Sequence, residues 1–343
     1  MRAHRLAGAI ACLALAGGIV HPTVAPGGTG GELSWQPLQS VPGIIDITGP
    51  RRDGRYVVTA GGRLSLLNPG SEPTPFARGP DGYLDPSGHE PYIALAPGGR
   101  VRGAGCSFER DDVFALDAGA QPGVFRVTVD GRAERFADLP SGTFPSGIGF
   151  DTFGRFGGRL LVTGVLGGAL GDAATLYGID CRGRLKPFVE GGPRVEGGIA
   201  VAPRSFGRHA GRLVAADEIS GRVVAFGANG SSRAIAAPGV PAGYDIGVES
   251  VGFVPRRFGP GDAAYLSDRA ESGGIFPGTN GLLVLGGKPL KRAGVRHGDL
   301  LVATEGGAET VRVRCHPECA VSQVATGPDI AHAEGHIEFG PSP

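Results

Sequence analysis

The sequence predicts an all-β chain folded as a β-propeller, and three observations carry this prediction. The 343 residues include 63 glycines and 28 prolines, and an interior glycine costs a helix about 1 kcal/mol relative to alanine. These glycines separate short apolar runs, as turn residues separate strands. The eight residues from Phe153 return at Phe206, 53 residues later, with six identities, and Phe258 begins a degraded third copy. Repeats of about 40 to 50 residues in a strand-rich chain are typical of propeller blades.

Each repeat divides into four predicted strands. The first is an apolar run, which recurs at residues 93–97, 148–150, 199–203 and 251–255. The second is β-branched, and its copies start near residues 55, 113, 159, 212, 264 and 300. The third ends at a hairpin dipeptide such as Asp130-Gly131 or Asn229-Gly230. A short fourth strand follows, for example at residues 133–136 or 185–188.

Six copies of the second strand predict a six-bladed propeller of four-stranded antiparallel blades. The sixth blade is expected to be irregular, with a helical turn at residues 288–297, so five or seven blades are the alternatives. A pair of β-sandwiches is a further alternative, which the regular offset disfavours. The propeller domain is expected to span residues 41–340. Residues 26–40 are expected to be a linker and a strand, near residues 32–36, that closes the last blade and covers its edge.

The amino terminus has the pattern of a signal peptide. Arg2, His4 and Arg5 precede an apolar run at residues 6–20, and small residues follow at 23–25. Residues 1–25 are therefore predicted to direct secretion. The alternative is a membrane anchor, which needs about 20 apolar residues and a stop-transfer flank. No later segment is apolar for long enough to span a bilayer.

Four cysteines follow this segment, and an even number in an oxidising compartment favours disulfides. Cys315 and Cys319 are expected to close a local loop, which leaves Cys106 and Cys181 to join neighbouring repeats. Four cysteines allow three connectivities, and zinc binding by Cys315, His316 and Cys319 is the alternative for the local pair.

Charge excludes one class of partner. The chain has 33 lysines and arginines against 33 acidic residues, with no basic run. Nucleic acid is therefore not an expected partner. A small molecule or an extracellular protein is expected instead.

Candidate site residues precede the first strand of several repeats, where a propeller channel opens. They are His89-Glu90, Ser146, Glu196 and Glu249-Ser250. Three glutamates at nearly the same register repel one another unless a cation compensates them. Calcium accepts six to eight oxygen ligands, so Glu90, Glu196 and Glu249 are the predicted calcium ligands. The alternative is that they are hydrated or arginine-paired structural carboxylates.

The blade motifs carry a family resemblance. The run from Val214 to Asp217, the run from Gly221 to Phe226, and the run from Phe114 to Asp117 resemble six-bladed propellers that include the gluconolactonases, regucalcin, strictosidine-synthase-like proteins and NHL-repeat proteins. The resemblance implies a divalent metal at the channel, polarising a lactone or ester carbonyl. It makes His89 the candidate acid–base residue. The asparagine common among that family's ligands is missing here, where Ser146 and Gly197 stand instead.

Two further groups stand out. Asp117, Asp217 and Asp268 end second strands and are expected to cap turns. Their neighbours Glu218 and Arg269 are expected to form weak surface pairs.

At the carboxy terminus, His332, Glu334 and His336 would share one face of a strand by its period of two. There they would form a candidate zinc site, or a strand tail with polar residues facing solvent.

The sequence thus predicts a secreted propeller that binds a small molecule or an extracellular partner at its channel mouth without evident catalysis. The alternative is a calcium-dependent lactone or ester hydrolase.

Overall fold

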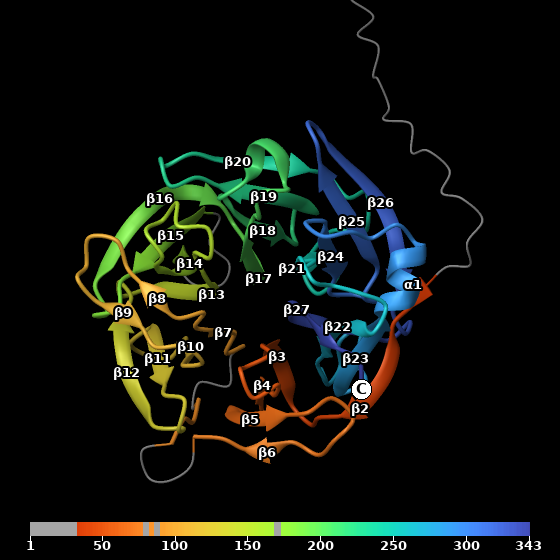
Figure 1. The fold of residues 1–343 in the computed structure, drawn as a ribbon, viewed down its shortest axis with the longest axis horizontal. Coiled ribbons are helices and arrows are strands. Elements are labelled where there is room, and N and C mark those ends of the chain that lie inside the picture. Colours follow the sequence, from red (N-terminus) through yellow and green to blue (C-terminus); the bar gives the residue numbers. More distant parts are fainter. Residues whose placement is uncertain (1–32, 78–81, 86–89, 168–172) are drawn as a thin grey trace, which may run out of the picture.

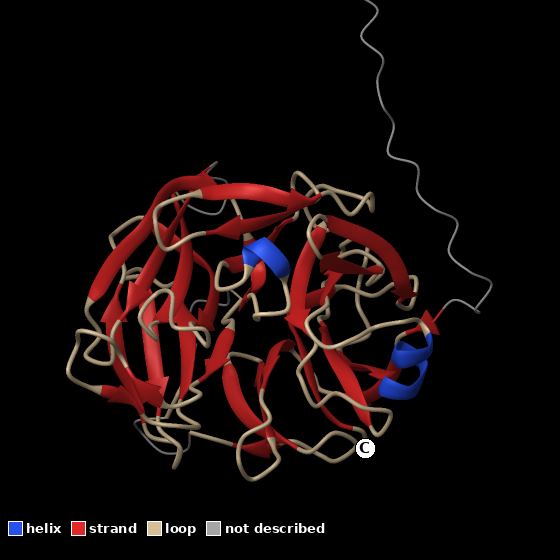
Figure 2. Cartoon of the chain, turned by 45° about the horizontal axis from the view of Figure 1, so that its top comes forward, coloured by secondary structure: helices blue, strands red, loops and turns tan. Residues whose placement is uncertain are grey.

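The computed structural model describes residues 33–77, 82–85, 90–167 and 173–343. The predicted signal peptide, the first part of the predicted linker, and His89 lie outside these residues. The chain is all-β and propeller-like: strands are arranged in sheets around a centre (Figure 1), with two short helices against them (Figure 2). The helices are η1 (Gly207–His209) and α1 (Gly287–Arg292). Across the described ranges, no helix has the length and apolar character needed to cross a bilayer.

Four sheets have four antiparallel strands each. In chain order their strands are β3 (Ile44–Thr48), β4 (Tyr56–Ala60), β5 (Arg63–Leu67) and β6 (Thr74–Pro75); β7 (Ile93–Leu95), β10 (Val113–Asp117), β11 (Gly123–Val127) and β12 (Ala133–Asp138); β13 (Thr143–Phe150), β14 (Leu160–Leu166), β15 (Ala173–Ile179) and β16 (Leu185–Pro193); and β17 (Glu196–Val201), β18 (Leu213–Asp217), β19 (Arg222–Phe226) and β20 (Ser232–Ala236). A small hairpin of β8 (Gly99–Arg100) and β9 (Ser107–Phe108) extends the β7–β10 connection.

The remaining strands form a nine-stranded sheet in the order β1-β26-β25-β24-β21-β27-β22-β23-β2. Their bounds are β1 (Leu33–Ser34), β2 (Gln36–Ser40), β21 (Val248–Phe253), β22 (Asp262–Asp268), β23 (Gly281–Gly286), β24 (Leu300–Thr304), β25 (Thr310–Cys315), β26 (Cys319–Thr326) and β27 (Ala333–Pro341). Its two halves meet where β21 pairs with β27, in parallel, at Val251 and His336.

The inner strands contact one another in a closed order around the centre. Each of β3, β7, β13, β17, β21 and β27 packs against the next, and β27 packs against β3 (Figure 1). Apolar side chains fill the space between neighbouring sheets. Phe114 of one sheet, for example, meets Phe150 of the next at 5.5 Å between ring centroids, with Leu160 in the same cluster. The core therefore lies between sheets, and the ring centre is left to polar groups.

The second strand of every predicted repeat is present. Two of these strands, β22 and β24, pair with other first strands than the order of repeats predicts. The order of repeats places residues 251–255 beside the strand at residue 264. Instead β21 pairs with β24, and β22 pairs with β27 and β23. The chain therefore forms β21 in one half of the nine-stranded sheet and then β22 and β23 in the other half. It returns to the first half for β24, β25 and β26, and ends in the second half with β27. The carboxy-terminal β27 covers the inner edge of β22, and the amino-terminal β2 covers the outer edge of β23, so both edges are paired.

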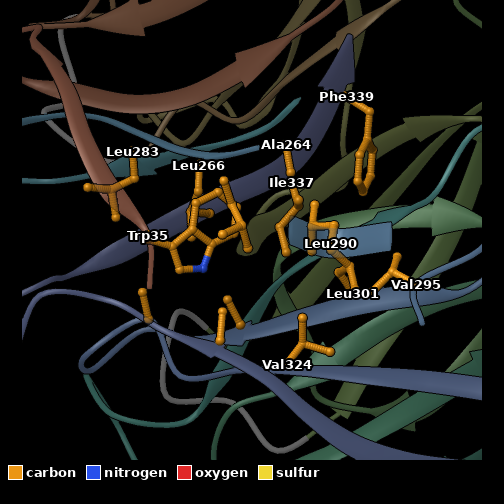
Figure 3. Close-up of a cluster of buried hydrophobic side chains, with 14 of the residues drawn as sticks. Trp35, Ala264, Leu266, Leu283, Leu290, Val295, Leu301, Val324, Ile337 and Phe339 are labelled. Atoms are coloured by element: carbon orange, nitrogen blue, oxygen red, sulfur yellow. The ribbon is translucent and has the colours of Figure 1, made fainter. Parts of the chain in front are cut away.

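Trp35 holds the ends of this sheet together. It lies between β1, which pairs with β26, and β2, which pairs with β23. Its side chain is buried among Leu266, Leu283, Val324 and Ile337 (Figure 3). Its indole Nε1 donates a hydrogen bond of 2.8 Å to Thr310 Oγ1, so the ring satisfies its one polar group while closing the apolar core.

Both predicted disulfides are present. Cys315 and Cys319 are joined within the β25–β26 hairpin. Cys106 and Cys181, 75 residues apart, join the β7–β10 connection to the β15–β16 hairpin. The local pair is therefore a disulfide, and His316 beside it is exposed. The helical turn predicted at residues 288–297 is also confirmed, as α1.

Candidate functional site

Antiparallel pairing gathers the charged residues at one end of the ring. Glu196 opens β17 opposite Ala216, near the end of β18, so Glu218 lies beside it. In the same way, Val248 faces Thr304, which brings Glu249 and Glu305 together. We call this end the mouth and define its cluster by six glutamates and three cationic residues. They are Glu90, Glu196, Glu218, Glu249, Glu305, Glu334, Arg194, Arg269 and His332.

Tyr92 is the hub of the cluster. Its hydroxyl lies 2.7 Å from Glu249 Oε1, and 3.0 Å from both Glu90 Oε2 and Glu334 Oε2. The ring is 1% exposed. A phenol has one proton to donate and an oxygen that accepts. Two of its three contacts therefore need a proton from a carboxyl group or a compensating cation.

Two arginines neutralise part of the charge. The Arg269 guanidinium pairs with Glu90 and lies 2.7 Å from Glu334 Oε1. Arg194 pairs with Glu196, and its Nη1 lies 3.6 Å from Glu218 Oε2. The cluster still holds more carboxylates than cations, and most of these side chains are buried.

Burial, together with the excess of negative charge, raises the pKa of most carboxyl groups in the cluster. Burial, reinforced by neighbouring carboxylates, raises the pKa of Glu196 to about 9 and that of Glu305 to about 8. It raises the pKa of Glu90 to about 7 and that of Glu249 well above its usual value. These groups share protons near neutral pH rather than all being ionised.

Glu334 is the exception. Burial alone would raise its pKa, but the hydrogen bond from His332 and the charge of Arg269 outweigh burial and lower the pKa to about 2. Burial also opposes the charge of His332, whose pKa is nevertheless raised to about 11 by Glu305 and Glu334. Glu334 is thus the fixed negative charge of the cluster.

His332, Glu305 and Glu334 fit a metal site. Their ligand atoms all lie within 4.8 Å of one another. His332 Nδ1 lies 2.9 Å from the Phe276 carbonyl oxygen and 3.1 Å from Glu271 Oε2. Its Nε2 lies 2.6 Å from Glu305 Oε1 and 3.4 Å from Glu334 Oε1. A neutral ring that donates from Nδ1 to the carbonyl presents its Nε2 lone pair to two carboxylates. That repulsion is relieved by a proton on Nε2 or by a cation between the groups, and a carbonyl partner on the other nitrogen is usual for metal-binding histidines.

The predicted calcium ligands are only partly brought together. Glu90 and Glu249 meet at the Tyr92 hydroxyl. Glu196 is paired with Arg194, yet the charge of Glu90 still raises its pKa. The assignment of these three residues as calcium ligands stays a prediction, as does the role of His89, which lies outside the described residues.

The predicted group of His332, Glu334 and His336 on one face is wrong. Gly335 lies between them with φ +67°, and the three residues 335–337 face only Leu266 of β22. This bulge turns His336 away from the mouth, where its Nδ1 lies 2.9 Å from Asp46 Oδ2 and its Nε2 3.0 Å from the Ile148 carbonyl oxygen. His332 and Glu334 stay together at the mouth.

The second-strand residues also differ from expectation. Asp117 and Asp217 cap turns as predicted, accepting from the backbone amides of Gly119 and Ser220. Asp268 is fully buried and accepts from Thr279 and His332 amides instead.

The prediction that Glu218 and Arg269 form weak surface pairs is wrong. Glu218 is 5% exposed and Arg269 ion-pairs with Glu334, because the mouth is where second strands end.

Sequence reasoning missed the other half of the cluster. Tyr92, Arg194, Arg269 and Glu305 were not assigned to the mouth. For Arg269 and Glu305 the signal was available: each directly follows a predicted second strand, and the end of a second strand lies beside the start of its first-strand partner. Because β21 pairs with β24 and β22 pairs with β27, the order of repeats does not reveal which first strand begins beside Arg269 or Glu305.

No family model and no curated protein matches the chain. Solved propellers are similar to it at low identity. A catalytically inactive virginiamycin B lyase of Staphylococcus aureus with quinupristin is 14% identical over 90% of this chain and 94% of that one, with a TM-score of 0.47. A streptogramin B lyase is 12% identical over 85% and 86%, at 0.45. A gluconolactonase of Xanthomonas campestris is 15% identical over 70% and 71%, at 0.42. The blade motifs and the structure agree on the fold, since the chain itself is propeller-like.

Proposed function

We propose that this chain is a six-bladed propeller whose mouth binds a divalent cation and, with it, a small polar ligand. Six blades follow if the nine-stranded sheet is counted as two, divided at β21 and β27. One residue pair joins these strands, whereas each strand pair from β21 to β26 and from β27 to β2 shares four to six. Each half then has an inner strand, two middle strands and an outer strand, like the other four sheets, and the two-residue β1 adds a fifth strand outside β26.

The observation that carries the cation is the placement of His332. Its Nε2 faces Glu305 and Glu334 while its Nδ1 is engaged by a carbonyl, and the ring is 1% exposed. One imidazole and two carboxylates suit zinc or manganese better than calcium, which prefers an all-oxygen shell. Glu249 is connected to this candidate metal site because the Tyr92 hydroxyl contacts both Glu249 and Glu334. Calcium at Glu90, Glu196 and Glu249 is the competing assignment, and the same excess of carboxylates supports it.

The ligand would meet the less buried part of the cluster. Glu90 and Arg269 are 23% and 24% exposed in their side chains and form one ion pair. A carboxylate beside a guanidinium binds hydroxyl, carboxyl or phosphate groups of a small molecule. The two disulfides are typical of proteins from oxidising compartments, which supports secretion and an extracellular ligand or partner.

Lactone or ester hydrolysis is the second candidate, and Glu90 favours it. With a pKa of about 7 and partial exposure, this carboxyl group suits a general base at neutral pH. Tyr92 and Arg269 hold it from two sides, which fixes its orientation. A bound divalent cation would supply Lewis-acid polarisation of the carbonyl.

Metal analysis and thermal unfolding of the purified chain test the proposal. We expect one equivalent of metal, and a stabilisation by zinc or manganese that chelator reverses and His332→Ala abolishes. Saturation at 100 times Kd stabilises the fold by about 2.7 kcal/mol. Glu190→Gln, at an exposed glutamate outside the cluster, is the matched control.

If calcium stabilises the wild type and His332→Ala but not Glu196→Gln, the cation site is formed by Glu90, Glu196 and Glu249 instead. No metal and no stabilisation by any of the three ions would refute a cation site. Hydrolysis of a model lactone that is lost in Glu90→Gln would establish the enzymatic alternative, and its absence would leave binding alone.

A further inference from the structure

The end of the ring opposite the mouth, which we call the far end, holds a groove of about 370 Å³. It is formed by the connections that follow the inner strands β13, β17 and β21. Its lining includes Phe153, Arg204, Phe253, Arg256 and His297. None belongs to the cluster at the mouth. The volume lies in the range of pockets that enclose a small organic molecule.

The walls of the groove are aromatic. The Phe153 and Phe253 side chains are both half-buried. Phe253 packs edge-on against the buried Phe206 at 4.9 Å between centroids, which fixes its ring. The guanidinium carbon of Arg204 lies 5.1 Å from the centre of the Phe153 ring, within cation–π distance. Ring and cation are thus positioned together before any ligand arrives.

The cations of the groove lack acidic partners among the described residues. Arg204 and Arg256 are exposed, and neither has a carboxylate within ion-pair distance in that part of the chain. Neighbouring arginines at the same end differ: Arg208 pairs with Glu318 at 2.7 Å, and Arg314 with Asp299 at 2.6 Å.

The nearby carboxylates do not supply the missing charge. Asp151, which begins the connection after β13, accepts from the backbone amides of Phe153, Gly154, Phe156 and Gly158. Asp299 is held by Arg314 and by the Arg296 amide. The groove therefore has a net positive charge beside its apolar walls.

We propose that this groove binds a small aryl anion, such as an aromatic carboxylate or an aryl phosphate. Arg204 and Arg256 engage the anionic group, since guanidinium forks match the oxygens of carboxylate and phosphate. Phe253 and the apolar edge of the groove cover the aromatic ring. His297 adds a third polar group: its Nδ1 lies 3.3 Å from the Val254 carbonyl oxygen and its Nε2 3.5 Å from Ser205 Oγ.

Calorimetric titration of the full chain with three probes tests both halves of this recognition. Phenyl phosphate carries ring and charge, inorganic phosphate only charge, and benzyl alcohol only the ring. We expect phenyl phosphate to bind with a stoichiometry of one and the other two probes to bind at least tenfold more weakly. An equal affinity for inorganic phosphate would overturn the role of the aromatic wall.

Variants locate the site. Arg256→Gln is expected to weaken phenyl phosphate about tenfold, because it removes a charge-assisted hydrogen bond. Arg257→Gln is the matched control, since Arg257 is the adjacent exposed arginine and does not line the groove. Equal losses in both variants would show nonspecific attraction to the basic end and refute the site. Unchanged binding in Arg256→Gln would refute it as well.

Two further variants complete the test. Phe253→Leu keeps an apolar side chain and is expected to weaken phenyl phosphate without changing inorganic phosphate. Glu334→Gln at the mouth is expected to leave phenyl phosphate binding unchanged, so this test is independent of the proposed cation site. Tighter binding in Glu334→Gln, as the loss of a repelling carboxylate would produce, would place the anion at the mouth and overturn the proposal.

Discussion

At the mouth, acidic side chains outnumber cations and are buried in a shared network around Tyr92. At the far end, the turns that repeat the Phe-Gly-Arg sequence expose arginines, and the carboxylates there are held by backbone amides or by single arginines. Both disulfides also lie at the far end. The mouth therefore depends on balanced charge, while the far end depends on local turns and covalent links. A net charge of zero conceals this separation.

The two ends should differ most in their response to the loss of one arginine. Arg269→Met is expected to lower the free energy of unfolding by about 3 kcal/mol, since it leaves Glu90 without its arginine and the buried Glu334 with His332 as its only cationic partner. Arg204→Gln, at the far end, is expected to change it by about 0.5 kcal/mol at most. Urea unfolding followed by circular dichroism measures both.

Equal losses in the two variants would show that the mouth network does not contribute specifically to stability. A bound divalent cation would reduce the loss in Arg269→Met, so both proteins are compared after treatment with chelator.

The hub of the mouth gives a smaller effect. Tyr92→Phe removes the hydroxyl that three carboxylates share, and should cost about 1 to 3 kcal/mol because those groups lose a partner inside the protein. Tyr83→Phe is the control, because the Tyr83 hydroxyl is buried with no hydrogen-bond partner in the described part of the chain. It should be neutral or slightly stabilising. The reverse order of the two losses in urea unfolding would contradict the role of Tyr92.

The sequence was sufficient for the scaffold because blade strands repeat with the same local pattern. All six predicted second strands are present, and α1 is where the repeat fails. It was not sufficient for the partners of β21 and β22, because strand order in a closed ring depends on where the chain ends dock, and local patterns do not encode that. The bulge at Gly335 was missed for a related reason. Glycine is required at this position because φ is +67° and a Cβ would lie 2.2 Å from Asp46 Oδ1, and Asp46 is almost 290 residues away in the chain.

The same limit applies to the site. Glu90, Glu196 and Glu249 could be picked out because they share a register in the repeats. Arg194, which pairs with Glu196, occupies no repeated position. Arg269 occupies one, directly after a second strand, but the strand start beside it could not be inferred from the order of repeats. Tyr92 could be recognised only once the sheets are assembled, since its partner Glu249 lies 157 residues away.

The smallest expected difference between the two ends is a pH dependence of the free energy of unfolding. Burial and the nearby Arg233, Arg208 and Arg212 lower the pKa of His209, at the far end, to about 4, opposite to the raised values at the mouth. Between pH 6.5 and 4 the unfolded chain binds a proton that folded His209 refuses, so the free energy of unfolding falls as pH falls through this window. His209→Gln removes that contribution. The difference between the two proteins in urea unfolding should therefore be constant from pH 8 to 7 and shift against the wild type from pH 6.5 downward, and a constant difference down to pH 4.5 would contradict the lowered pKa.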